Sequence, residues 1–128
     1  MWQHGHFHWN ELMTRDVEAA KAFYGDIVGW TFNPMPMPEG GTYWVGMDGD
    51  QPVGGIFDMT GTDFEDSPPQ WMSYLAVDDV DARVEAAVKA GAKIVQPPID
   101  IPDVGRFIMI QDGGGAIIGW MTPANPQG

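Results

Sequence analysis

The sequence predicts an α+β fold made of two βαβββ modules in tandem. Its 128 residues, 44% hydrophobic and 19% charged, fit one globular domain. The segment that starts at Trp9 is matched 63 positions later by the one that starts at Met72, with Leu, Asp, Val and Ala at corresponding places. Gly55 aligns with Gly119 at nearly the same offset. We therefore expect a single domain, 1–128, with modules at 7–59 and 71–122 and a linker at 60–70.

The first module is expected to begin with a strand and a helix. The segment 7–14 is rich in apolar and strand-compatible residues, and Asp16 is a suitable N-cap. Apolar residues then recur every three or four positions, as on one helix face: Val17, Ala20, Phe23, Tyr24 and Ile27. Gly29 can end this helix in a left-handed conformation.

The second module repeats this order. A strand is expected at 71–77, and Asp79 is the N-cap of the helix that follows. The apolar stripe of this helix ends before Gly91 and consists of Val80, Val84, Ala87 and Val88.

Three further strands complete each module. Short strands are expected at 30–33 and 93–95, each ended by the proline-rich segment that follows it. Two hairpins come next, with glycine-containing turns at 48–51 and 112–115. The linker is polar and lacks periodicity, as loops do.

Charge and composition exclude several partners. The formal net charge of −12 repels nucleic acid phosphates and anionic lipid headgroups, so neither a nucleic acid nor a membrane partner is expected. No apolar run reaches the length of a membrane span, and the first residues do not form a signal segment, so we expect a cytoplasmic protein. Without Cys, the available chemical groups are His, Asp, Glu and Tyr.

Several motifs resemble the vicinal oxygen chelate superfamily, which includes glyoxalase I, bleomycin-resistance proteins and extradiol dioxygenases. They include the Phe23-Tyr24 pair, Gly29-Trp30 and the Asp-x-x-Gly turn at 112–115. Gly29-Trp30 and this turn, together with the segments at 9–16 and 98–107, are similar to an antigen-like or hydroxylase-like branch. The resemblance implies an open, barrel-like mixed sheet around a central cleft, and a homodimer.

The resemblance also identifies where this superfamily holds a divalent metal. Its four ligand positions fall on Trp9, Gly55, Met72 and Gly119, and none of these residues is a ligand for a hard cation. We therefore expect no metal and no other cofactor. Glyoxalase I and dioxygenase activities depend on that metal, so they are not expected either. A binding role like that of bleomycin-resistance proteins remains open.

The mapped cleft predicts a ligand-binding surface, because residues two apart on a strand share a face. Its members are aromatic, Met and carboxyl side chains: Trp9, Glu11, Met13, Phe57, Met59, Met72, Tyr74 and Met121. Such a surface suits a small apolar, aromatic or cationic molecule. The alternative is that these side chains only fill the core.

Two side chains on this surface could carry catalysis. Glu11 as base and Tyr74 as acid would make the protein a metal-independent isomerase, epimerase or hydrolase. The structural alternative is a solvated Glu11, or one paired with Arg106 or Arg15, and a Tyr74 that makes a plain hydrogen bond. A third hypothesis is a metalloenzyme, a lyase or dioxygenase, with displaced ligands.

The first residues contain a different cluster of possible metal ligands. His4, His6 and His8 alternate, so an extended arm would place all three imidazoles on one face, pointing away from the cleft. We expect such an arm to capture metal adventitiously rather than physiologically.

Overall fold

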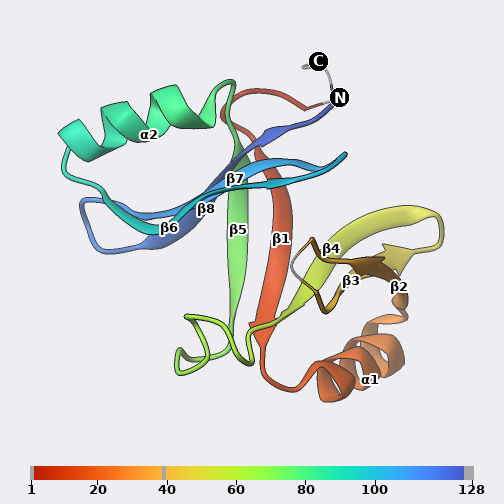
Figure 1. Ribbon diagram of the computed structural model, residues 1–128. Helices are drawn as coiled ribbons and strands as arrows, with labels where there is room; N and C mark the ends of the chain where they lie inside the picture. Colours follow the sequence, from red (N-terminus) through yellow and green to blue (C-terminus); the bar gives the residue numbers. More distant parts are fainter. Residues whose placement is uncertain (1, 39, 126–128) are drawn as a thin grey trace. The chain divides into compact units, whose positions relative to one another are not determined.

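The computed structural model describes residues 2–38 and 40–125 (Figure 1). In chain order the elements are β1 (Phe7–Thr14), α1 (Val17–Val28), β2 (Thr31–Pro36), β3 (Thr42–Asp48), β4 (Gln51–Asp58), β5 (Gln70–Ala76), α2 (Val80–Lys89), β6 (Lys93–Ile101), β7 (Gly105–Gln111) and β8 (Ile117–Pro123). The strands form one mixed sheet in the order β2-β3-β4-β1-β5-β8-β7-β6. The predicted α+β class and the two βαβββ modules are confirmed.

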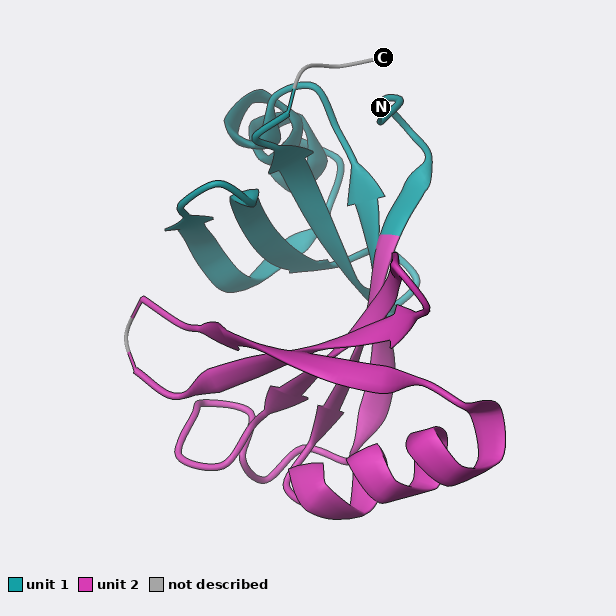
Figure 2. Cartoon of the chain, turned by 90° about the vertical axis from the view of Figure 1, so that its right-hand side faces the viewer, with its two compact units in different colours: residues 1–8, 73–128 teal, residues 9–72 magenta. Residues whose placement is uncertain are grey.

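The chain divides into two compact units (Figure 2). The first module unit consists of residues 9–72, and the second module unit consists of residues 1–8 and 73–128. Strands β1 and β5 contribute residues to both units.

In the first module unit, α1 begins and ends at the predicted residues. The Asp16 carboxylate accepts a hydrogen bond from the backbone N–H of Ala19 at 3.0 Å, which satisfies a donor of the first turn. Gly29 ends the helix with a φ of 87°, a left-handed conformation that glycine adopts without strain. Helix α1 packs against β4.

The two faces of this unit's sheet are distinguished by their contacts. On the α1 side, the ammonium group of Lys21 lies 3.5 Å from the centroid of the Trp44 ring. The Trp30 ring covers Gly46 and Gly54 on the same side. Because neighbouring residues on a strand point to opposite faces, Tyr43 and Gly55 belong to the face away from α1.

In the second module unit, α2 covers the strands β6, β7 and β8. The Asp79 carboxylate accepts from the backbone N–H of Ala82 at 3.1 Å, as the sequence predicts for an N-cap. Beneath the helix lies a buried apolar cluster of Val77, Val80, Ile108 and Ile110. This cluster includes the first residue of the predicted α2 stripe and anchors the helix to the sheet.

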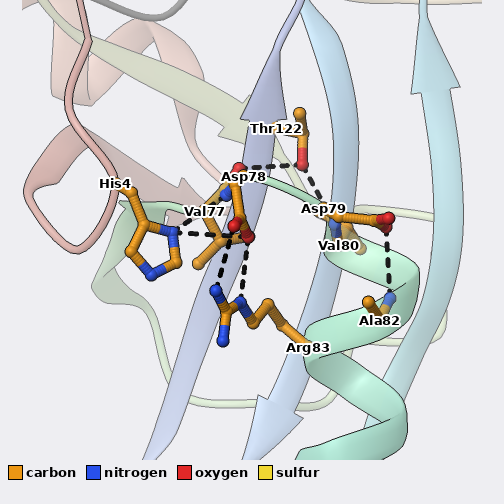
Figure 3. Close-up of polar contacts among 8 residues, drawn as sticks. All are labelled: His4, Val77, Asp78, Asp79, Val80, Ala82, Arg83 and Thr122. Atoms are coloured by element: carbon orange, nitrogen blue, oxygen red, sulfur yellow. Dashed lines mark hydrogen bonds and ion pairs between the residues drawn. The ribbon is translucent and has the colours of Figure 1, made fainter.

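The N-terminal arm is bound to the end of β5 (Figure 3). The N–H of Gly5 donates to the carbonyl of Ala76 at 2.7 Å, and the Nδ1 atom of His4 accepts from the N–H of Asp78 at 3.0 Å. The arm turns at His4 and Gly5 instead of continuing as a strand. The three histidines therefore do not share one strand face.

The prediction that prolines end the second strand of each module was wrong. β2 runs through Pro34 to Pro36, and β6 runs through Pro97 and Pro98. Both strands lie at the edges of the sheet, where a residue without an N–H leaves no neighbour unpaired. In β6 the pairing with β7 also shifts register around the two prolines.

Residues 60–69 of the predicted linker have no helix or strand, whereas Gln70 is the first residue of β5, and the linker is fixed by an arginine. The guanidinium of Arg15 donates to the backbone carbonyls of Glu65 and Ser67 at 2.8 and 2.7 Å.

Within residues 2–38 and 40–125, no helix is long and apolar enough to cross a bilayer.

Candidate functional site

The candidate site starts from a close fit between Tyr43 and Gly55. A Cβ atom placed on Gly55 would overlap the hydroxyl oxygen of Tyr43, so only glycine leaves room for that hydroxyl. In the parallel pairing of β1 with β4, Glu11 is the register partner of Gly55. The pairing therefore brings Glu11 to the same level of the sheet as the Tyr43 hydroxyl.

A chain of hydrogen bonds connects three side chains on this face. The indole N–H of Trp9 donates to the Tyr43 hydroxyl at 2.8 Å, and Tyr43 is hydrogen-bonded to the Glu11 carboxylate. Both Glu11, 8% exposed, and Tyr43 are buried, and Trp9 is half-buried. We call this group the Trp9-Tyr43-Glu11 chain.

The Tyr43 phenol remains protonated within this chain. Burial raises its pKa far above the usual value of 10.0, and the negative charge of Glu11 raises the pKa further. Tyr43 is therefore a hydrogen-bond donor at any physiological pH.

The arginines that sequence reasoning offered as partners of Glu11 bind elsewhere. Arg106 forms ion pairs with Asp81 and Asp100 at 3.1 and 2.8 Å, and Arg15 binds the linker carbonyls. Glu11 is also not a solvated surface residue, because only 8% of its surface is exposed.

The second module unit contains the counterpart of the Tyr43 and Gly55 pair. Tyr74 and Gly119 are register partners in β5 and β8, and a Cβ atom on Gly119 would overlap the Tyr74 ring. The Tyr74 ring is buried and makes an edge-on contact with Phe107 at a centroid distance of 5.7 Å. Here the ring, and not the hydroxyl, lies over the glycine.

The predicted ligand-binding residues are divided between the two units. The first module unit contains Trp9, Glu11, Met13, Phe57, Met59 and Met72, and the second contains Tyr74 and Met121. Met13 and Phe57 are register partners on β1 and β4. Met13, Met59, Met72 and Met121 are all buried, so these four methionines serve as core residues in the structure.

The superfamily's metal does not fit the residues at its four ligand positions. Trp9 and Met72 lack a donor for a hard cation, and the side-chain space at Gly55 and Gly119 is taken by tyrosines. Among the described residues, no group of three His, Asp or Glu side chains is arranged to hold a metal ion, and this includes His4, His6 and His8.

Sequence reasoning missed Tyr43. The internal repeat drew attention to Tyr74, which is equivalent to Glu11, whereas Tyr43 lies 32 positions from Glu11 on another strand. The available signal was Gly55 itself, because a glycine inside a buried strand often indicates the close approach of another group.

Comparison with known proteins identifies the family. Residues 5–119 match the model of the Glyoxalase/Bleomycin resistance protein/Dioxygenase superfamily. The chain belongs to this superfamily, as the motifs indicated.

Two curated relatives and one solved structure illustrate the range of similar proteins. "Putative glyoxylase CFP32" of Mycobacterium tuberculosis is 41% identical over 121 residues, which cover 93% of this chain and 44% of the relative. "Anthracycline biosynthesis protein DnrV" of Streptomyces peucetius is 29% identical over 119 residues, which cover 84% of this chain and 43% of the relative. The chain thus spans less than half the length of these two relatives.

The solved structure is methylmalonyl-CoA epimerase from Mycobacterium tuberculosis, with a TM-score of 0.66 and 16% identity. The match covers 94% of this chain and 89% of the epimerase. At this identity the likeness concerns the fold alone.

Proposed function

We propose that this protein binds a flat aromatic molecule, neutral or cationic, without a metal, at the face of the first module unit that carries the Trp9-Tyr43-Glu11 chain. The observation behind the proposal is the buried, hydrogen-bonded carboxylate of Glu11 beside an indole and a phenol. Aromatic faces can stack on a planar ligand, and a carboxylate of low exposure attracts a cationic group strongly.

The overall charge favours a cationic ligand. Most basic groups are already engaged: Lys21, Arg83, Lys89 and Arg106 form ion pairs with acidic side chains, and Arg15 binds carbonyls. The formal charge of −12 therefore leaves many carboxylates without a basic partner, and their field attracts cations.

The names of the relatives support a choice of probe. One relative is named for anthracycline biosynthesis, and the family description includes bleomycin resistance. Daunorubicin, an anthracycline with planar rings and an amine, is a suitable first ligand to test.

A second candidate function is a metal-independent isomerase, epimerase or hydrolase with Glu11 as the base and Tyr74 as the acid. The burial of Glu11 is the observation that favours it, because a base of low exposure is shielded from water. The metalloenzyme with displaced ligands is the third alternative.

Isothermal titration calorimetry of metal-free protein with daunorubicin tests the binding proposal. We expect Glu11→Gln to weaken binding at least about tenfold, as the loss of an interaction with a charged group does. Asp26→Asn, which removes the same charge from an exposed position on α1, should leave affinity unchanged. Equal affinity of Glu11→Gln and the unsubstituted protein would contradict the proposal.

Two further measurements distinguish the alternatives. A Glu11→Gln variant that binds normally but loses turnover of a substrate would favour the enzyme. Inductively coupled plasma mass spectrometry of untagged protein, dialysed against a chelator, measures any bound metal. A stoichiometric metal that is retained would favour the metalloenzyme.

A further inference from the structure

We propose that Tyr43 is the positioning residue of the candidate site, and that its hydroxyl, lodged in the space left by Gly55, holds Glu11 as an ionised hydrogen-bond acceptor. This inference rests on the proposed function and deepens it. Nothing in the sequence pattern or the family resemblance assigns a role to Tyr43.

The Tyr43 hydroxyl fills the side-chain space of Gly55. The atom that a Cβ on Gly55 would meet first is the Tyr43 hydroxyl oxygen, followed by the ring carbon that carries it. The hydroxyl therefore occupies the volume in which the superfamily, by the mapping above, carries the side chain of a metal ligand. A polar group, the Tyr43 hydroxyl, lies at that position, but it comes from β3 and not from β4, the strand of Gly55.

The hydrogen bonds of Tyr43 run in one direction, from the Trp9 indole through the phenol to Glu11. An indole N–H can only donate, so the 2.8 Å contact with Trp9 must use a lone pair of the Tyr43 oxygen. The single phenol proton is then available for Glu11, to which Tyr43 is hydrogen-bonded. Trp9 thus orients the phenol, and the phenol donates to the carboxylate.

The hydrogen bond from Tyr43 acts on the charge of Glu11. A hydrogen bond donated to a carboxylate favours its ionised form, and this effect opposes the desolvation that burial imposes on Glu11. The phenol cannot become a competing anion, because burial and Glu11 both raise the pKa of Tyr43. Glu11 is thereby kept negative for a cationic ligand.

The second module unit has no equivalent arrangement. Over Gly119 the nearest atoms belong to the side of the Tyr74 ring, not to its hydroxyl. The positioning role is therefore specific to the first module unit.

The test compares Tyr43→Phe with Tyr24→Phe. Tyr24 is a matched control because its hydroxyl also accepts from an indole, the N–H of Trp71 at 3.2 Å, but it lies on α1. Infrared spectra are recorded between pH 3 and 8 for each protein and for the same protein with Glu11→Gln added. The difference between the two spectra isolates the carboxylate band of Glu11. Daunorubicin affinity at pH 7 is measured on the same proteins.

In Tyr43→Phe we expect Glu11 to take up its proton about one pH unit higher than in the unsubstituted protein, the tenfold effect of one lost hydrogen bond to a charged group. We also expect daunorubicin affinity to fall, with no further fall when Glu11→Gln is added. Trp9→Phe, which leaves the phenol in place, should shift the titration less and in the same direction. Tyr24→Phe should match the unsubstituted protein in both measurements.

The outcomes separate this inference from the proposed function. If daunorubicin binds and depends on Glu11, but Tyr43→Phe and Trp9→Phe leave the infrared titration unchanged, the inference about Tyr43 is overturned and the binding function stands. If the titration shifts as expected but no daunorubicin binds, Tyr43 does position Glu11, and the proposed ligand is wrong.

Discussion

The ring of Tyr74 lies over Gly119, its register partner on the neighbouring parallel strand, in the space that any other residue would need for its Cβ atom. Tyr43 and Gly55 form the corresponding pair in the first module unit. Each module thus uses a glycine in its last strand to accommodate a tyrosine on the face away from its helix.

Gly119→Ala is expected to destabilise the protein by at least about 2 kcal/mol, because the added methyl group must displace a buried ring. Urea denaturation measures the change. Combining it with Tyr74→Ala should cost less than the sum of the two single effects, since the overlap is then relieved. Gly113→Ala, at a position with open space, should change stability by less than about 0.5 kcal/mol. Additive effects at 74 and 119 would contradict the steric account.

Asp16→Ala is expected to lower the free energy of unfolding by about 1 kcal/mol, because it removes the carboxylate that caps α1. Asp26→Ala removes the same charge from within α1, where no cap is lost, and serves as the control. Guanidinium denaturation compares the two variants. An equal loss in both would show that the cap makes no special contribution.

The pairing of Asp78 with Arg83 should stabilise the fold only above acidic pH (Figure 3). Two hydrogen bonds of 2.9 Å from the guanidinium lower the pKa of Asp78 from 3.8 to about 2. A lowered pKa in the folded state means that the stabilisation is complete above about pH 4 and is lost as the pH falls towards 2.

A double-mutant cycle of Asp78→Asn and Arg83→Gln measures this coupling at several pH values. We expect the coupling to be favourable at pH 6 and to fall steadily below pH 4. The exposed pair of Glu85 and Lys89, with one contact of 3.5 Å, should show a smaller coupling at pH 6. A coupling between Asp78 and Arg83 that grows with acidity would contradict the prediction.

We propose that the protein forms a homodimer through α1. No residue of this helix is buried, and Phe23 and Ile27 are 57% and 72% exposed. Sedimentation should give twice the chain mass of 14.0 kDa, and Ile27→Asp should reduce it to the monomer without unfolding the protein. Val88→Asp on α2 is the matched control and should remain dimeric. A monomeric unsubstituted protein would exclude this proposal.

Local signals were sufficient to predict both helices. Asp16 and Asp79 each accept from the backbone N–H three residues later, and Gly29 adopts the left-handed conformation assigned to it. Such contacts involve residues close in the chain, so the sequence order alone contains the required information. The apolar stripe of α1 was also visible, but its exposure depends on tertiary packing and was not predicted.

The extent of the proline-containing strands depended on information that the local sequence lacks. A proline ends a strand in the middle of a sheet but is compatible with an edge strand. Only the complete strand order shows that β2 and β6 are edges.

The site was predicted in part. Strand parity placed Trp9 and Glu11 on one face, and the structure connects them through Tyr43. The strand that carries Tyr43 reaches Glu11 only because β4, with Gly55, lies between β3 and β1. No spacing rule relates residues 11 and 43, so this contact required the fold.

The tyrosine and glycine pairs also limit which mutations the protein can accept one at a time. An acidic residue introduced at 55 alone would collide with Tyr43, while loss of the Tyr43 side chain alone would open a cavity in a buried site. Either route passes through a weakened intermediate. Introducing a cation site into this protein, by design or by natural mutation, would therefore weaken the fold least if both positions changed together.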